Sequence, residues 1–131
     1  MTEQLVGFEL AKILKERGFN FNVTFLYDSE TGGLNNKWIP GGVAAPTQSL
    51  VQSWLREKHN ILISVHTAYT QNIVDENLIY SFKPSIEIIE YIGENIFKTD
   101  LKYEMFHGLK PMNYEDAMEL GLMEALKLVE L

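Results

Sequence analysis

Residues 46–65 read Pro-Thr-Gln-Ser-Leu-Val-Gln-Ser-Trp-Leu-Arg-Glu-Lys-His-Asn-Ile-Leu-Ile-Ser-Val, the pattern of an amphipathic helix that runs directly into a strand. Thr47 is suited to cap the helix, because its hydroxyl can accept from an unpaired amide of the first turn. The apolar residues recur along one helical face, and Asn60 is a residue type that ends helices in the left-handed conformation. The alternation that follows predicts a strand over 61–69. We expect Trp54 to fill the centre of the core.

The composition is that of a soluble globular protein. The 131 residues are 46% hydrophobic and 22% charged. There is no cysteine, which excludes a disulfide framework, a thiolate nucleophile and a cysteine-ligated metal. No apolar run approaches the roughly 20 residues that span a bilayer, and no signal-peptide pattern opens the chain. We therefore expect a cytoplasmic protein, of a cell or of an infected host, without a membrane partner.

The net charge of −7 is unevenly distributed along the chain. Residues 1–60 hold six basic and six acidic residues, whereas residues 61–131 hold five basic and twelve acidic residues. An acidic half repels a phosphate backbone, so we expect no nucleic-acid partner. Because the acidic residues are scattered, most of them are expected to form a solvated surface.

The N-terminal third predicts a helix followed by a hairpin. Residues 2–17 have the periodicity of a helix, and Gly18 is a typical stop. Residues 19–27 alternate between apolar and polar side chains and predict a strand, with 34–39 as its return strand. Residues 40–46 are small and predict a flexible linker into the central helix.

Three further strands are expected after the central helix and its strand. Residues 78–82 predict a short strand that Pro84 interrupts. Residues 85–92 permit a helix, but their β-branched content and the turn after them favour a strand. Residues 96–106 would be the returning strand of a hairpin.

A closing helix is predicted from Asn113, which can cap it together with Asp116 three residues later. Small residues recur along this helix at intervals of four: Ala117, Gly121 and Ala125. A glycine in a helix interior costs about 1 kcal/mol relative to alanine. A close approach of the helix to the sheet would account for a glycine at position 121 despite this cost.

Together these elements predict an α+β fold in a single domain, residues 1–131. Residues 1–45 supply a helix and a hairpin, and residues 46–131 supply a helix, strands and the closing helix. We expect an antiparallel sheet with the central and closing helices packed on one face.

From Thr47 onward, the order helix, three strands, helix resembles the double-stranded-RNA-binding fold. That fold binds RNA through basic residues near the start of its last helix. This sequence carries Glu115, Asp116 and Glu119 there, which would repel phosphate. The resemblance therefore implies an arrangement of elements and does not imply RNA binding.

Three segments of the sequence are distinctive. Residues 10–19 read Leu-Ala-Lys-Ile-Leu-Lys-Glu-Arg-Gly-Phe, residues 45–61 read Ala-Pro-Thr-Gln-Ser-Leu-Val-Gln-Ser-Trp-Leu-Arg-Glu-Lys-His-Asn-Ile, and residues 113–128 read Asn-Tyr-Glu-Asp-Ala-Met-Glu-Leu-Gly-Leu-Met-Glu-Ala-Leu-Lys-Leu. They resemble a family of small uncharacterised proteins from bacteriophages and prophages of Bacteroidetes-type hosts. The resemblance implies a phage or prophage setting in the cytoplasm of a bacterial host, and it carries over no catalytic residue.

No catalytic or metal-binding motif stands out in the sequence. The histidines, His59, His66 and His107, lack the spacing of a helical zinc site. The turn after Asp28 lacks the ligands of a calcium loop. No Gly-x-Ser-x-Gly elbow is present. We therefore expect no metal, no cofactor and no enzymatic activity.

Aromatic residues are the better lead to function. Trp38 and Arg56, with Gly41 and Gly42, could form a ligand-binding pocket near the linker. Tyrosines suit protein interfaces, and four of them are candidates for such a surface: Tyr69, Tyr80, Tyr91 and Tyr103. The alternative is that these rings are half-buried or cover the edge of the sheet.

These observations predict a non-enzymatic phage accessory protein that acts through protein–protein contacts. Its partner is undefined and could be a second copy of the chain in a homodimer. The alternative function is binding or sequestering a small, nucleotide-like molecule. A minimal hydrolase that uses scattered carboxylates is the weakest hypothesis.

Overall fold

The structure is a computed structural model that describes residues 4–21, 23–71, 78–94, 96–104 and 113–129. The described residues form three helices and two antiparallel sheets, which confirms the α+β class. The elements are, in chain order, α1 (Phe8–Glu16), β1 (Leu26–Tyr27), β2 (Leu34–Asn35), β3 (Val43–Ala44), α2 (Gln48–His59), β4 (Ile61–Gln71), β5 (Leu78–Gly93), β6 (Ile96–Glu104) and α3 (Tyr114–Leu126).

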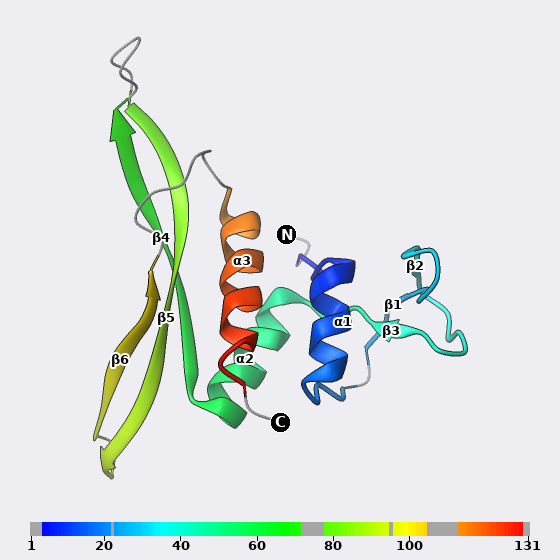
Figure 1. Ribbon diagram of the computed structural model, residues 1–131, viewed down its shortest axis with the longest axis horizontal. Coiled ribbons are helices and arrows are strands. Elements are labelled where there is room, and N and C mark those ends of the chain that lie inside the picture. The colour runs from blue at the N-terminus through cyan, green and yellow to red at the C-terminus, as the bar shows by residue number, and fades with distance from the viewer. Residues whose placement is uncertain (1–3, 22, 72–77, 95, 105–112, 130–131) are drawn as a thin grey trace.

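The helices lie between the two sheets (Figure 1). The larger sheet has the order β4-β5-β6, and both α2 and α3 lie on one of its faces, as the sequence predicts. Helix α1 packs against α3 on the side away from this sheet. The small sheet, in the order β2-β1-β3, lies beyond α1 at the opposite end of the molecule. We call residues 19–45, which contain the small sheet, the distal lobe.

The predicted signals at both ends of α2 are confirmed. The hydroxyl of Thr47 accepts a hydrogen bond from the backbone N–H of Leu50 at 3.2 Å, and Asn60 ends the helix with φ of 55°. Between them, Trp54 is only 6% exposed and packs edge-on against Phe19 with ring centroids 5.3 Å apart. The helix therefore contributes the aromatic centre of the core, as expected.

Helix α3 lies close to the larger sheet because Gly121 has no side chain. A Cβ atom at this position would lie 3.0 Å from Ile63 Cγ2 and 3.0 Å from Pro84 Cβ. The side chain of Asn113 caps the helix by accepting from the backbone N–H of Asp116 at 2.7 Å. The cap and the close approach predicted for this helix are both confirmed.

Strand β5 is continuous where the sequence predicted a break. The preference for strand over helix at 85–92 is confirmed, but the interruption at Pro84 is wrong. Within the described residues, β6 pairs with β5 only from Ser85 onward, so Pro84 has a strand neighbour only in β4, where it lies opposite Val65. Strands tolerate a residue without an N–H group where one side of the ladder is open.

Helix α1 is shorter than the helix predicted over 2–17. The preceding residues are extended and pair with the chain that enters α2. Leu5 forms an antiparallel bridge with Thr47, and the N–H of Val6 donates to the carbonyl of Pro46 at 2.9 Å. These backbone bonds hold the segment out of a helix despite its favourable periodicity.

The distal lobe contains less strand than predicted. The strand expected over 19–27 is reduced to β1, and the return strand expected over 34–39 is reduced to β2. The linker 40–46 contains β3. Phe19 instead packs against Phe21, with ring centroids 4.9 Å apart, and against the core. The alternation of apolar and polar residues at the start of this segment therefore reflects the packing of aromatic rings and not the pairing of strands in a sheet.

Candidate functional site

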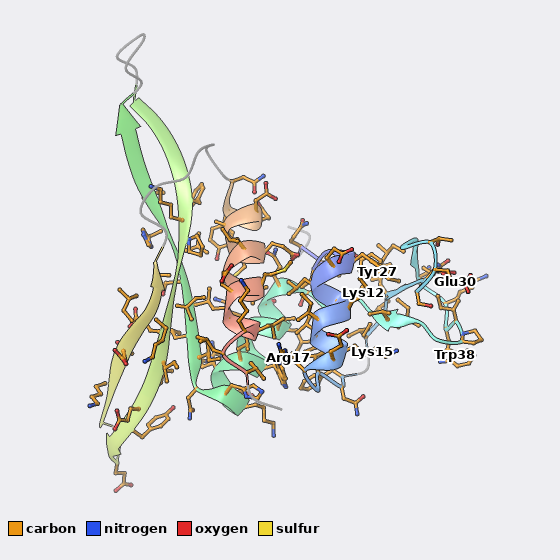
Figure 2. The ribbon with its side chains drawn as sticks, in the orientation of Figure 1. Lys12, Lys15, Arg17, Tyr27, Glu30 and Trp38 are labelled. Carbon is orange, nitrogen blue, oxygen red and sulfur yellow. The ribbon has the colours of Figure 1, made fainter. Side chains whose placement is uncertain are left out.

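Trp38 lies at the outer end of the distal lobe, far from the larger sheet (Figure 2). Its side chain is 80% exposed, more than any other large hydrophobic residue in the described part of the chain. Leaving an indole ring in water forgoes the roughly 1.5–3 kcal/mol that burial of a large apolar side chain provides. Tryptophan is enriched among the residues that contribute most to binding at protein interfaces, so Trp38 is a candidate contact residue.

A pocket of about 550 Å³ lies beside this ring. Its lining includes residues from the distal lobe and from α1: Lys15, Phe21, Lys37, Trp38, Gly41 and Gly42. We call this the Trp38 pocket. Phe21 is 42% exposed, so two aromatic rings are available on its walls. The volume is within the range of roughly 300–1,000 Å³ that is typical of ligand sites.

The two lysines give the Trp38 pocket a positive charge. Lys15 comes from α1 and Lys37 from the loop after β2, and none of the described residues that line the pocket is acidic. The distal lobe has two acidic residues, Asp28 and Glu30, in the turn between β1 and β2. The carboxylate of Asp28 is occupied there, accepting from the backbone N–H of Glu30 at 2.8 Å and of Thr31 at 3.2 Å.

Gly41 and Gly42 form the turn that follows Trp38 in the chain. Gly41 has φ of +71°, a conformation that side chains rarely adopt. A Cβ atom on Gly42 would lie 2.8 Å from Ile39 Cγ1, and the N–H of Gly42 donates to the carbonyl of Ile39 at 3.1 Å. The two glycines thus fix the conformation of the turn, and they also form part of the wall of the Trp38 pocket.

The predicted ligand-binding residues are only partly brought together. Trp38 and both glycines line one pocket, whereas Arg56 does not. Arg56 is exposed on α2, and its guanidinium donates to Ser53 Oγ at 3.1 Å. The places of Phe21 and of both lysines in this pocket could not be predicted, because no local sequence pattern indicates that α1 and a later loop meet.

A second pocket, of about 690 Å³, lies where the N-terminal segment, Tyr27 and the first turns of α2 and α3 meet. Its acidic residues are Glu115, Asp116 and Glu119. We call this the acidic cleft. The side chain of Gln48 crosses it and donates to the carbonyl of Glu115 at 3.0 Å. The sequence indicated the three acidic residues but not the cleft.

Polar groups in the acidic cleft bind one another and join separate elements. The Glu119 carboxylate accepts from the backbone N–H of Gly7, and the Tyr27 hydroxyl donates to the carbonyl of Val6 at 2.6 Å. Burial raises the pKa of Glu119 and of Tyr27, and the negative charge of Glu119 raises the pKa of Tyr27 further. The first bond holds the start of α1 to α3, and the second holds β1 to the segment that precedes α1, so the cleft has a structural role.

The predicted interface tyrosines all lie on the larger sheet. Tyr91 is 63% exposed near the end of β5. Tyr69 and Tyr80 are directly opposite each other in the β4–β5 register, and Tyr103 is opposite Ile86 in the β5–β6 register. The side chains of Tyr69, Tyr80 and Tyr103 lie outside the described part of the structure, so their role in an interface stays a prediction.

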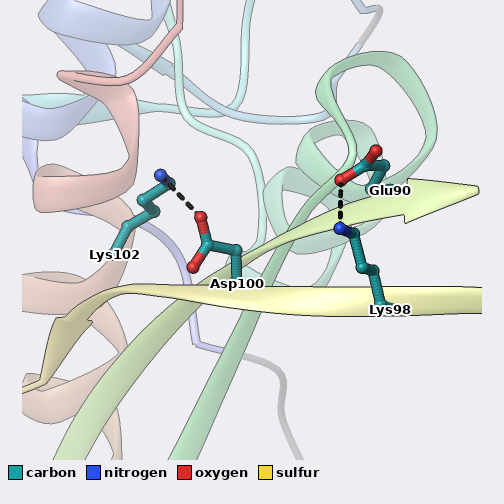
Figure 3. A network of polar contacts seen from close by, with 4 residues as sticks. All are labelled: Glu90, Lys98, Asp100 and Lys102. Atoms are coloured by element: carbon teal, nitrogen blue, oxygen red, sulfur yellow. Dashed lines mark ion pairs between the residues drawn. The ribbon is translucent and has the colours of Figure 1, made fainter.

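Two ion pairs lie on the β5–β6 hairpin (Figure 3). Lys98 lies 3.3 Å from Glu90 across the hairpin, and Lys102 lies 2.8 Å from Asp100 on the same strand. The hydrogen bond and the charge of Lys102 lower the pKa of Asp100. Lysines on an edge strand disfavour pairing with another strand. Direct addition of a strand to this edge is therefore disfavoured.

The described histidines do not form a metal site. The ring of His59 packs edge-on against Trp54, with centroids 4.7 Å apart, and His66 is exposed. His107 lies outside the described residues. Over the part of the chain that is described, no three His, Cys, Asp or Glu side chains are grouped to hold a metal ion. Within the same limits, none of the helices has the length and apolarity to cross a membrane.

The two pockets differ in how their charged groups are used. The carboxylate of Glu119 in the acidic cleft is bonded to α1, whereas neither lysine of the Trp38 pocket forms an ion pair with any described residue.

Comparison with protein-family models, with curated proteins and with solved structures gave no match to this chain. The Trp38 pocket is thus the candidate functional site on geometric grounds.

Proposed function

We propose that this chain is a non-enzymatic accessory protein that acts through protein–protein contacts anchored by Trp38. The observation that carries the proposal is the 80% exposure of this side chain at the end of the distal lobe. Tryptophan is among the residue types that contribute most of the energy of protein interfaces. The phage or prophage setting rests on the sequence resemblance and belongs to the same proposal.

The attachment of the distal lobe supports this role. The N–H of Ala45 donates to the carbonyl of Phe25 at 3.0 Å, which ties the last residue of the lobe to the residue before β1. Tyr27 packs edge-on against Phe8 of α1, with ring centroids 5.4 Å apart. A surface fixed before binding loses less conformational entropy when the partner binds. The lobe therefore presents Trp38 in a defined position.

The test is co-purification from the bacterial host with three forms of the tagged full-length chain. We expect a partner to be retained by the natural chain and by Trp38→Phe, and to be reduced at least tenfold by Trp38→Ala. The melting temperature should be unchanged in both variants, because the exposed ring makes few contacts within the chain. An identical set of proteins with Trp38→Ala would exclude Trp38 as the anchor.

A second candidate function is favoured by the Trp38 pocket itself. Its volume of about 550 Å³ and its two lysines suit a small anionic molecule with an aromatic ring, such as a nucleotide. Binding to the folded state raises the melting temperature by mass action. A panel of mononucleotides and cyclic dinucleotides should then shift the melting temperature of the natural chain but not of Trp38→Ala. No shift across the panel would reject this function.

A further inference from the structure

We infer that the partner reaches the Trp38 pocket with an acidic segment, in which carboxylate side chains alternate with apolar ones. The inference rests on the proposed function and specifies the chemistry of the partner. It follows from the charges of the pocket, from the use made of each lysine, and from the exposure of the aromatic walls.

The Trp38 pocket is positively charged. Lys15 and Lys37 are brought to it from separate elements, and its described lining contains no carboxylate. The acidic cleft elsewhere in the molecule has the opposite composition, with three acidic residues and no basic one among the described residues that line it. The chain thus separates its charges between two concave surfaces. A carboxylate bound between the two ammonium groups would be attracted by both.

The two lysines of α1 differ in their contacts within the chain. Lys12 is engaged within the chain, because its ammonium lies 3.1 Å from a carboxylate oxygen of Glu9 and 4.7 Å from the ring centroid of Phe8. One turn later, Lys15 has no ion pair with any described residue and lines the pocket. Lys37 is equally without a carboxylate among the described residues. Both pocket lysines are therefore available to an external anion.

The aromatic residues on the walls of the Trp38 pocket are exposed. A pocket that encloses a small molecule buries most of that molecule's surface. Here Trp38 is 80% exposed and Phe21 is 42% exposed, so much of the apolar surface faces outward. A polypeptide segment can cover these rings with apolar side chains while its carboxylates reach the lysines. This arrangement favours a segment of protein over a small ligand.

The net charge of −7 favours a short acidic segment over a polyanion. A nucleic acid carries phosphates along its whole length and would meet the acidic surface of the chain as well as the pocket. Charges more than about 8 Å apart are largely screened at physiological ionic strength. A segment with a few carboxylates is therefore influenced mainly by the pocket.

The experiment uses two fluorescein-labelled peptides and the full-length chain. One peptide has twelve residues of repeated Glu-Phe-Ser, and the other replaces each Glu with Lys. Fluorescence anisotropy should show at least tenfold tighter binding of the acidic peptide at 50 mM salt. Lys15→Glu and Lys37→Glu should each weaken this binding at least fivefold. Lys58→Glu, the same charge change at an exposed position outside the pocket, should leave it unchanged.

Several results would overturn the inference. One is equal binding of the two peptides, and another is no binding of the acidic peptide below 1 mM. The same affinity after charge reversal at Lys15 and Lys37 would also overturn it, as would displacement of the peptide by micromolar ATP. Failure of the proposed function is distinguishable. If partner capture needs Trp38 but peptide binding ignores both lysines, only the inference about charge fails. If capture ignores Trp38, the proposed function fails as well.

Discussion

The carboxylate of Glu119 accepts hydrogen bonds from the backbone N–H of Gly7, with Oε2 at 2.8 Å and Oε1 at 3.2 Å. Gly7 is the N-cap residue of α1 and has no side chain to cap that helix. A residue of the last helix therefore provides the cap of the first helix, across 112 positions of sequence. This contact helps to keep α1, and the distal lobe beyond it, against the rest of the molecule.

Removing this carboxylate should weaken the fold. We expect Glu119→Ala to lower the free energy of unfolding by about 1 kcal/mol, the usual cost of a lost helix cap. Glu119→Gln keeps an acceptor oxygen for Gly7 and removes a partly buried charge, so it should stay within about 0.5 kcal/mol of the natural chain. Urea denaturation at pH 7 measures both values. Equal destabilisation by the two substitutions would show that the charge, rather than the acceptor, matters.

The stability should depend on pH through the same group. Burial raises the pKa of Glu119 above its ordinary value of 4.5, so the folded chain holds this proton more tightly than the unfolded chain. The resulting stabilisation is complete below the unfolded pKa and is lost as the pH rises through the folded pKa. The free energy of unfolding of the natural chain, relative to Glu119→Gln, should therefore be larger at pH 4 than at pH 7. A difference that is independent of pH would contradict the raised pKa.

Gly121 should be required for the packing of α3 on the sheet. Alanine has the higher helix propensity by about 1 kcal/mol, but its methyl group would lie 3.0 Å from atoms of Ile63 and Pro84. Overpacking of a core costs about 1–3 kcal/mol. We therefore expect Gly121→Ala to lower the free energy of unfolding by about 1 kcal/mol, measured by urea denaturation.

A double-mutant cycle provides the control for this prediction. Ile63→Ala removes the methyl group that the new side chain would meet, so Gly121→Ala should be less destabilising in that background. If the two effects simply add, the close contact with Ile63 is not the reason for the glycine.

The end of α2 should depend on the left-handed conformation of Asn60, whose φ is 55°. Glycine adopts this conformation without strain, whereas alanine does not. Asn60→Gly should therefore leave the melting temperature unchanged or raise it, and Asn60→Ala should cost about 1 kcal/mol. A more stable Asn60→Ala variant would contradict the assigned end of the helix.

The parts of the fold that could be predicted from sequence are those with local causes. Thr47, Asn60 and Asn113 act through bonds or backbone angles within a few residues, so their pattern alone located the ends of α2 and the start of α3. The alternation at 19–27 was misleading, because its rings pack against one another and against α1 and α2. The continuity of β5 through Pro84 was missed because it depends on where β6 begins to pair.

The candidate site was only partly predictable for a related reason. Trp38 could be identified as a candidate because it and the tyrosines are too many aromatic residues for all of them to lie in the centre of the core. Its association with Lys15 depends on how α1 lies beside the loop after β2, which no local pattern encodes. Arg56 was grouped with Trp38 because both flank the linker in sequence, but it lies on an exposed part of α2 outside the pocket.

The most direct test of the central claim is photo-crosslinking from position 38 in living cells that produce the full-length chain. A photoreactive phenylalanine derivative replaces Trp38 in one form of the full-length chain and Lys58, also exposed but outside the Trp38 pocket, in a control. We predict a discrete crosslinked product from position 38, containing one identifiable partner protein, and none from position 58. Absence of any product at position 38, or the same products at both positions, would contradict a contact surface anchored by Trp38.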